Sequence, residues 1–126
     1  MRGQALVFTG ADRPEVQEIQ LPDLQPHEVL VETAYSCISP GTEMRCLAGK
    51  QDGAHFPFIP GYSLSGRVAA TGNDVTLAPG TPVFCTGTTK ASLPLAWGGH
   101  VSHAILPASN VYPIPPSMDL LEASSA

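Results

Sequence analysis

Charged side chains are scarce in this sequence of 126 residues, and no segment gathers positive charge. Asp, Glu, Lys and Arg make up 13% of the chain, well below the usual quarter of a soluble protein. The 6 Lys and Arg residues are outnumbered by 11 Asp and Glu residues, which gives a net charge of −5 at pH 7. Because nucleic acids and anionic membranes are bound by clustered basic side chains, we expect neither as a partner.

Long hydrophobic runs and paired cysteines are also missing. Runs such as Ala5–Phe8 are far too short to span a bilayer, and the residues around Arg2 form no readable signal peptide. The 3 cysteines are an odd number without the spacing of a disulfide framework. We therefore expect a reduced, cytoplasmic protein that does not enter a membrane.

Glycine and proline, in contrast, are frequent, with 12 and 13 residues. Such breakers leave room for short strands rather than for long helices. The clearest strand is Glu28–Ile38. Its alternate residues form one half-buried face, which consists of Val29, Val31, Thr33, Tyr35 and Cys37. Similar patterns predict a hairpin of Gln4–Phe8 with Pro14–Leu21, and further strands at Ser63–Gly72, Thr81–Thr86, Gly98–Leu106 and Val111–Ile114.

Two segments favour helices. Gly41–Gly49 contains no proline and ends on a glycine that suits a helix C-terminus. Asp119 is placed to cap a second helix that begins at Leu120. Roughly seven short strands with one internal helix predict an all-β or mainly β fold, a small antiparallel barrel.

The residue types alone do not reveal a catalytic or metal site. No Cys-x-x-Cys pair offers the ligands of a structural zinc site. His100 and His103 lie on a predicted strand, where residues three apart point to opposite faces and could not share one ion. We expect one of these histidines to be exposed and the other to lie near the domain surface. No strand–GxGxxG–helix element is present, so this chain cannot bind a dinucleotide by the usual route.

Five segments, taken in order along the chain, resemble a known family. They are Ser39–Glu43, Pro60–Val68, Gly80–Phe84, Gly98–Ala108 and Ile114–Ser124. Together they resemble the N-terminal, GroES-like domain of the medium-chain dehydrogenase/reductase superfamily, the relatives of the zinc alcohol dehydrogenases. The resemblance implies that residues 1–126 form a GroES-like barrel with one short internal helix. The first two segments are similar to a zinc-poor branch that includes the bacteriochlorophyllide dehydrogenases.

The zinc ligands of that family are replaced in this sequence. Pro40 stands where zinc-dependent members have a ligating cysteine, and Tyr62 and Ser63 stand where they have histidine and often glutamate. Of the four cysteines of the family's structural zinc lobe, only Cys85 is present. The resemblance therefore implies a domain without catalytic or structural zinc. A rearranged zinc site is an alternative, with ligands drawn from Cys37, Cys46 and His55.

Thr42 and Tyr62 are the candidate catalytic residues. Thr42 matches the hydroxyl residue that relays the substrate proton in zinc-dependent members, and Tyr62 adds a second hydroxyl able to polarise a carbonyl without metal. Each has a structural alternative, Thr42 as the N-cap of the helix and Tyr62 as an ordinary half-buried barrel tyrosine. Glu43 could instead stabilise the helix N-terminus, and Trp97 could close the barrel mouth. The candidate substrate-binding residues are Ser39, Glu43, Ser63 and Trp97.

The resemblance implies an enzyme domain that works with a second domain. We expect the substrate-binding and catalytic domain of an NAD(P)-dependent, zinc-independent oxidoreductase acting on an alcohol, a ketone or an activated alkene. The domain that binds NAD(P)(H) would follow Ala126 in cis or come from another chain in trans, so this chain alone would be inactive. Further expected partners are a small-molecule substrate and, in one arrangement, a second copy in a homodimer. The alternative is a free-standing GroES-like binding or assembly module without catalysis.

Overall fold

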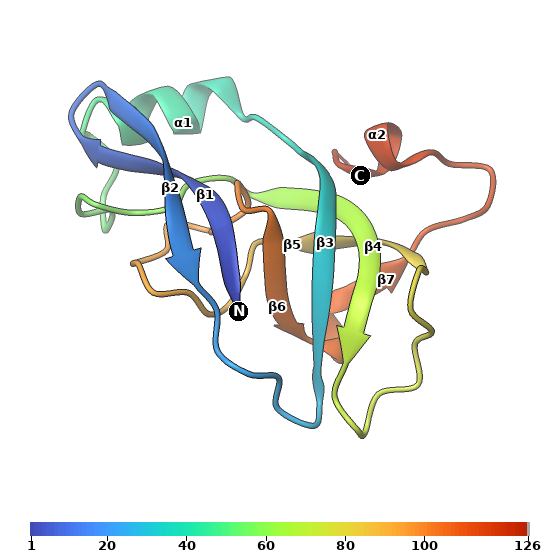
Figure 1. The fold of residues 1–126 in the computed structure, drawn as a ribbon. Coiled ribbons are helices and arrows are strands. Elements are labelled where there is room, and N and C mark those ends of the chain that lie inside the picture. Colours follow the sequence, from blue (N-terminus) through green and yellow to red (C-terminus); the bar gives the residue numbers. More distant parts are fainter. Residues whose placement is uncertain (126) are drawn as a thin grey trace.

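Two antiparallel sheets and two short α-helices make up the fold in the computed structural model, which describes residues 1–125 (Figure 1). β1 and β2 form a two-stranded sheet, and the other strands form a curled five-stranded sheet in the order β6-β3-β4-β5-β7. The predicted mainly β fold with an internal helix is confirmed. The elements in chain order are β1 (Arg2–Gly10), β2 (Arg13–Gln20), β3 (Glu28–Ser36), α1 (Pro40–Leu47), β4 (Ser63–Thr71), β5 (Pro82–Thr86), β6 (His103–Pro107), the 3₁₀ turn η1 (Ala108–Asn110), β7 (Val111–Pro113) and α2 (Leu120–Ala123).

The predicted hairpin of β1 and β2 is confirmed, and it is tied to the rest of the chain through β1. Isolated bridges pair Ala5 with Val101 and Phe8 with Phe58. Ala5 and Phe8 are both buried. The hairpin therefore closes over the core of the five-stranded sheet instead of extending that sheet.

Strand β3 lies inside the five-stranded sheet, between β6 and β4. Val29 and Val31 are fully buried, as the alternating pattern predicts. The β3–β4 register then shifts between Thr33 and Tyr35, which marks an irregularity of the kind a β-bulge produces. Tyr35 is 47% exposed, so the prediction that it shares the buried face of Val29 is wrong. An extra residue at a bulge moves the following side chains to the other face of the sheet.

Helix α1 docks on β1 through a small second core. Phe8, Cys46 and Phe58 are its buried residues, and the rings of Phe8 and Phe58 meet edge-on with centroids 5.7 Å apart. The helix ends as predicted, because Gly49 adopts a φ of 78° and its N–H donates to the carbonyl of Cys46 at 3.0 Å. This docking places the first turn of α1 beside the end of β3.

The C-terminal segment covers β4. The Asp119 side chain accepts the N–H of Glu122 at 2.8 Å, so the predicted cap of α2 is confirmed. Ser65 is fully buried, and its hydroxyl donates to the carbonyl oxygen of Leu120. None of the helices within residues 1–125 combines the length and the apolarity that crossing a membrane requires.

A buried carboxylate anchors the start of β3, and its partner gives a test of stability. Burial of Glu28 opposes ionisation, but hydrogen bonds from Lys90 Nζ (2.9 Å) and the Gln25 N–H (2.8 Å) outweigh burial and lower the pKa of Glu28 below its ordinary value of 4.5. A lowered folded-state pKa stabilises the fold above pH 4.5, and this contribution is lost as the pH falls through the folded-state value.

We expect Lys90→Met to lower the free energy of unfolding by about 1–3 kcal/mol near neutral pH, since the carboxylate stays buried without its cation. The matched control is Lys50→Met, at an exposed lysine that forms no ion pair within residues 1–125. Urea unfolding monitored between pH 7 and pH 3 should show the deficit of Lys90→Met shrinking below about pH 4.5. A deficit that is constant across this range would contradict the assignment.

Candidate functional site

Thr42 lies in the first turn of α1, which follows β3 after a short link. The N-cap is Ser39, with extended φ and ψ angles of −101° and 97°, and its side chain makes no capping hydrogen bond. The alternative that Thr42 caps the helix is therefore wrong, because Thr42 already lies inside it. Its hydroxyl is left for contacts outside the helix.

Tyr62 and Thr42 are hydrogen-bonded to each other through their side chains. The Tyr62 hydroxyl donates to Thr42 Oγ1 at 2.7 Å. A threonine hydroxyl that accepts in this way keeps its own hydrogen for a further acceptor. The Trp97 ring meets Tyr62 edge-on, with centroids 4.6 Å apart and an interplanar angle of 67°. Three residues singled out in the sequence therefore gather at one place, and we call Thr42 and Tyr62 the donor pair.

The donor pair is open to solvent on the side of Trp97. Tyr62 is 37% exposed and Trp97 is 42% exposed. Trp97 has a φ of 76°, in the left-handed region that non-glycine residues rarely adopt. The neighbouring N–H groups of Ala96 and Gly98 both donate to the carbonyl of Ile59, at 3.0 and 3.1 Å, and hold this conformation. Strained residues of this kind gather at binding sites more often than elsewhere.

Gly61 places Tyr62 against the segment that carries His100. It has a φ of 103°, and a Cβ at this position would meet the backbone N of His100 at 2.8 Å and its ring carbons at 2.9 Å. The Gly99 N–H donates to the carbonyl of Gly61 at 2.8 Å. The two segments are thus in direct contact, and only glycine combines this backbone conformation with this close approach.

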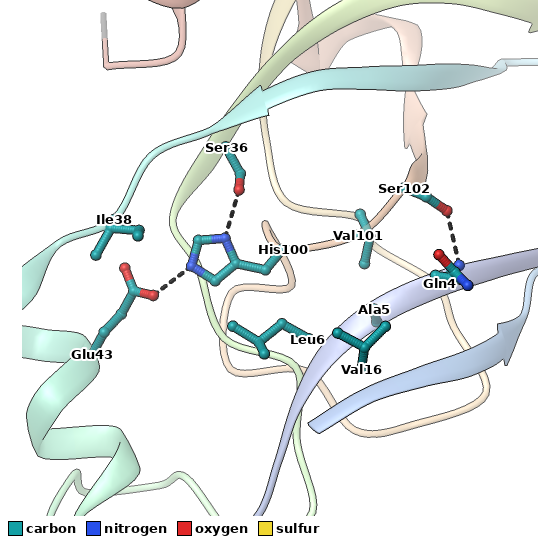
Figure 2. A pocket seen from close by; sticks show the side chains of 10 residues that line it. All are labelled: Gln4, Ala5, Leu6, Val16, Ser36, Ile38, Glu43, His100, Val101 and Ser102. Atoms are coloured by element: carbon teal, nitrogen blue, oxygen red, sulfur yellow. Dashed lines mark hydrogen bonds and ion pairs between the residues drawn. The ribbon is translucent and has the colours of Figure 1, made fainter. Parts of the chain in front are cut away.

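A buried hydrogen-bonded array adjoins the donor pair through Glu43, which follows Thr42 in α1, and no pattern in the sequence indicates it. His100 Nε2 bonds the carboxylate of Glu43 through Oε1, and His100 Nδ1 bonds Ser36 Oγ at 2.7 Å (Figure 2). Glu43 Oε2 accepts the N–H of Ser39 at 2.5 Å. His100 is 8% exposed and His103 is half-buried, so the expectation that one of these two histidines is exposed is wrong. His103, half-buried, bonds Ser102 Oγ at 2.9 Å instead.

No sequence signal links His100 with Glu43, because the two residues are 57 positions apart. Glu43 itself was singled out, and the structure supports the interpretation that its charge stabilises the helix N-terminus, since it accepts the N–H of the N-cap residue. The prediction that a strand begins at Gly98 is also wrong, because β6 begins only at His103. The backbone of His100 pairs outside that strand, donating to the Pro60 carbonyl at 3.0 Å.

The array borders a cavity of about 410 Å³ between β1, the end of β3 and the start of α1 (Figure 2). Its walls are mainly apolar, and His100 and Glu43 supply its most buried polar groups. The lining residues are Gln4, Ala5, Leu6, Val16, Ser36, Ile38, Glu43, His100, Val101 and Ser102.

The two remaining candidate substrate-binding residues have structural partners. Ser63 Oγ donates to the carbonyl oxygen of Ser124 at 2.8 Å and so fixes the C-terminal segment against β4. Ser39 is half-buried and contributes its backbone N–H to Glu43. The structure therefore brings Thr42, Tyr62 and Trp97 together, and Glu43 is buried next to Thr42 in α1.

The side chains at the family's zinc positions do not form a ligand set. Within residues 1–125, no group of three His, Cys, Asp or Glu side chains is arranged to hold a metal ion. Burial raises the pKa of Cys46, and the negative charge of Glu43 raises it further. Burial also raises the pKa of Cys85 to about 12. Both thiols are therefore protonated near neutral pH, which suits packing rather than nucleophilic or metal-binding chemistry.

Residues 25–116 match the family described as the alcohol dehydrogenase GroES-like domain. The 2-desacetyl-2-hydroxyethyl bacteriochlorophyllide A dehydrogenase of Cereibacter sphaeroides is 29% identical over 128 aligned residues, which cover 94% of this chain and 40% of that protein. The chain thus spans well under half the length of this relative.

Solved structures share the fold at lower identity. The human synaptic vesicle membrane protein VAT-1 homolog-like protein superposes on 100% of this chain and 40% of its own, with a TM-score of 0.82 and 21% identity. A short chain alcohol dehydrogenase from E. coli, complexed with NADH, superposes on 98% of this chain and 41% of its own, with a TM-score of 0.78 and 20% identity. The expected GroES-like resemblance is confirmed.

The close approach at Gly61 gives a test of the site's packing. We expect Gly61→Ala to lower the free energy of unfolding by about 1–3 kcal/mol more than Gly80→Ala does. Both variants place alanine at a positive φ, but only the methyl group at position 61 meets His100. Gly80 is a matched control, since its φ is 87° but a Cβ there has nothing within 4 Å. Urea unfolding of the two variants measures the difference. Equal losses would show that His100 yields to the methyl group without cost.

Proposed function

Since the chain belongs to the alcohol dehydrogenase GroES-like domain family, we propose that it forms the substrate-binding and catalytic domain of a zinc-independent, NAD(P)-dependent oxidoreductase. The hydrogen bond from Tyr62 to Thr42 carries the proposal. The proposed substrate is an alcohol, a ketone or an activated alkene whose oxygen binds at the donor pair.

The proposed chemistry of the donor pair follows from its hydrogen bonding. Tyr62 donates to Thr42, so the Thr42 hydroxyl is polarised and directs its own hydrogen to a substrate carbonyl oxygen. Negative charge that develops on this oxygen during reduction is stabilised by the donated hydrogen bond. In the oxidation of an alcohol, Thr42 Oγ1 takes the proton of the substrate hydroxyl while it passes its own hydrogen to water, which reaches this half-buried side chain. The Trp97 ring beside Tyr62 supplies an apolar wall for the body of the substrate.

The proposal that no zinc takes part rests on the donor set. Zinc prefers thiolate, imidazole and carboxylate ligands, and the family's ligand positions hold Pro40, Tyr62 and Ser63. Of these, Tyr62 and Ser63 already donate hydrogen bonds within the fold, to Thr42 and to the carbonyl of Ser124. The hydroxyl pair thus takes over the polarising role that a metal would serve.

Within residues 1–125 no Gly-rich turn joins a strand to a helix, so this part of the chain lacks the usual dinucleotide-binding element for the nicotinamide cofactor. When bound, the cofactor would supply or receive the hydride. We propose that a nucleotide-binding domain holds it, in cis beyond Ala126 or in trans. The chain covers only about 40% of the length of its relatives, which supports an arrangement in cis.

The first test is steady-state turnover of the protein that carries both this chain and its nucleotide-binding domain, with NADH and NADPH. We expect Thr42→Val to lower kcat by about 10²–10³-fold, because a donor to the developing charge is lost. Thr42→Ser should retain most activity. Tyr62→Phe should cost about 10-fold, since it removes only the bond that polarises Thr42.

The matched control is Tyr112→Phe, which removes the hydroxyl of an exposed tyrosine on β7 and should not change kcat. Unchanged turnover in Thr42→Val would disprove the role of the donor pair. Absence of hydride transfer with every substrate class named above, together with stable binding of a protein partner, would favour the non-catalytic assembly module.

The second test is metal content. Protein prepared without chelator or His-tag should contain far less than one zinc per chain and should keep its activity after dialysis against a chelator. About one zinc per chain, lost together with activity, would overturn the zinc-independent proposal.

A further inference from the structure

We propose that His100 is a positioning residue that sets the geometry of the donor pair by joining the helix that carries Thr42 to the turn that carries Tyr62. The predicted effect of His100 on turnover rests on the proposed function, whereas its effect on the geometry of the donor pair does not. The contacts that support it belong to the fold itself.

On one side, the ring of His100 holds the start of α1. Its Nε2 bonds the carboxylate of Glu43, the residue that follows Thr42 in the helix. The side chains of His100 and Glu43 are 6% and 9% exposed, so water does not replace this bond readily. The other carboxylate oxygen of Glu43 accepts the N–H of Ser39, at the N-cap. The bond from His100 therefore restrains the whole first turn of the helix.

On the other side, the same residue holds the turn before Tyr62. The ring of His100 lies against Gly61 so closely that a Cβ there would approach its carbons to 2.9 Å. The backbone N–H of His100 donates to the carbonyl of Pro60 at 3.0 Å. Thr42 and Tyr62 are thus each one residue away from a direct contact of His100. A shift of this ring changes the distance between their hydroxyl groups.

The hydrogen bonds of the ring are compatible with both of its protonation states. Nε2 faces a carboxylate and therefore carries a hydrogen, an assignment that follows from its partner. In the neutral ring, Nδ1 accepts from the Ser36 hydroxyl, and in the charged ring it donates to the Ser36 oxygen. The bond to Glu43 is retained in either state, so it is the contact that a substitution must preserve.

Two near-isosteric substitutions separate the two ring nitrogens. His100→Gln places an amide N–H₂ near the position of Nε2 and can still donate to Glu43. His100→Asn places its amide near Nδ1 and can reach only Ser36. His103→Gln is the matched control, because His103 contacts Ser102 and neither member of the donor pair. These small polar changes avoid the empty space that His100→Ala would leave beside a buried carboxylate.

The experiment uses the protein with its nucleotide-binding domain, labelled with 5-fluorotryptophan, and the Trp97 resonance is assigned with Trp97→Phe. We expect His100→Asn to lower kcat by about 10–100-fold with KM changed less than about 3-fold, since sub-ångström misplacement of a donor acts on the transition state. It should also shift the Trp97 resonance, because Trp97 packs on Tyr62. His100→Gln and His103→Gln should stay close to wild type in kcat, KM and resonance position.

Equal losses in His100→Gln and His100→Asn would overturn the proposal, because the bond to Glu43 would then not be the link. Wild-type kcat and an unshifted Trp97 resonance in both variants would overturn it as well. If His100→Asn shifts the Trp97 resonance while Thr42→Val leaves turnover unchanged, His100 still positions the pair, and the catalytic role of the pair is what fails.

Discussion

Four parts of the chain meet at His100, and the arrangement of the site depends on this meeting. Its carbonyl accepts the N–H of Leu6 in β1 at 2.9 Å, and its N–H donates to Pro60 at 3.0 Å. Its ring bonds Ser36 at the end of β3 and Glu43 in α1. The hairpin, the sheet, the helix and the turn before β4 therefore share one buried residue. Such a hub is rigid because each polar group has a partner and little room remains for alternatives.

Within residues 1–125 two carboxylates are buried, Glu28 and Glu43, and each is paired with a basic side chain from a distant segment. Glu28 meets Lys90 where β3 begins, and Glu43 meets His100 where β3 has just ended. A buried carboxylate without a partner would cost several kcal/mol, so each pair selects one arrangement of the segments that carry it. Both ends of β3 are thereby held, and the end near α1 is the one that borders the donor pair.

The resemblance to the zinc-dependent members of the family implies that this chain keeps their fold and replaces their zinc ligands. The positions that the resemblance assigns to their zinc ligands hold Pro40, Tyr62 and Ser63 here, and the chain shares the GroES-like fold. Pro40 begins α1, Tyr62 donates to Thr42, and Ser63 anchors the C-terminal segment. In the proposed function, a hydrogen-bond donor replaces zinc as the group that polarises the substrate oxygen. Catalysis then requires that this donor is placed precisely.

The sequence by itself determined the local elements and the family. Glycine and proline spacing placed the hairpin and α1, and the Asp119 side chain marked the start of α2, because turns and caps depend on residues that are neighbours in the chain. The ordered motifs pointed to the GroES-like fold and to Thr42 and Tyr62. The bulge that exposes Tyr35 and the burial of His100 were decided only by the tertiary structure. Both arise from contacts across strands and segments that lie far apart in the sequence, which local periodicity does not record.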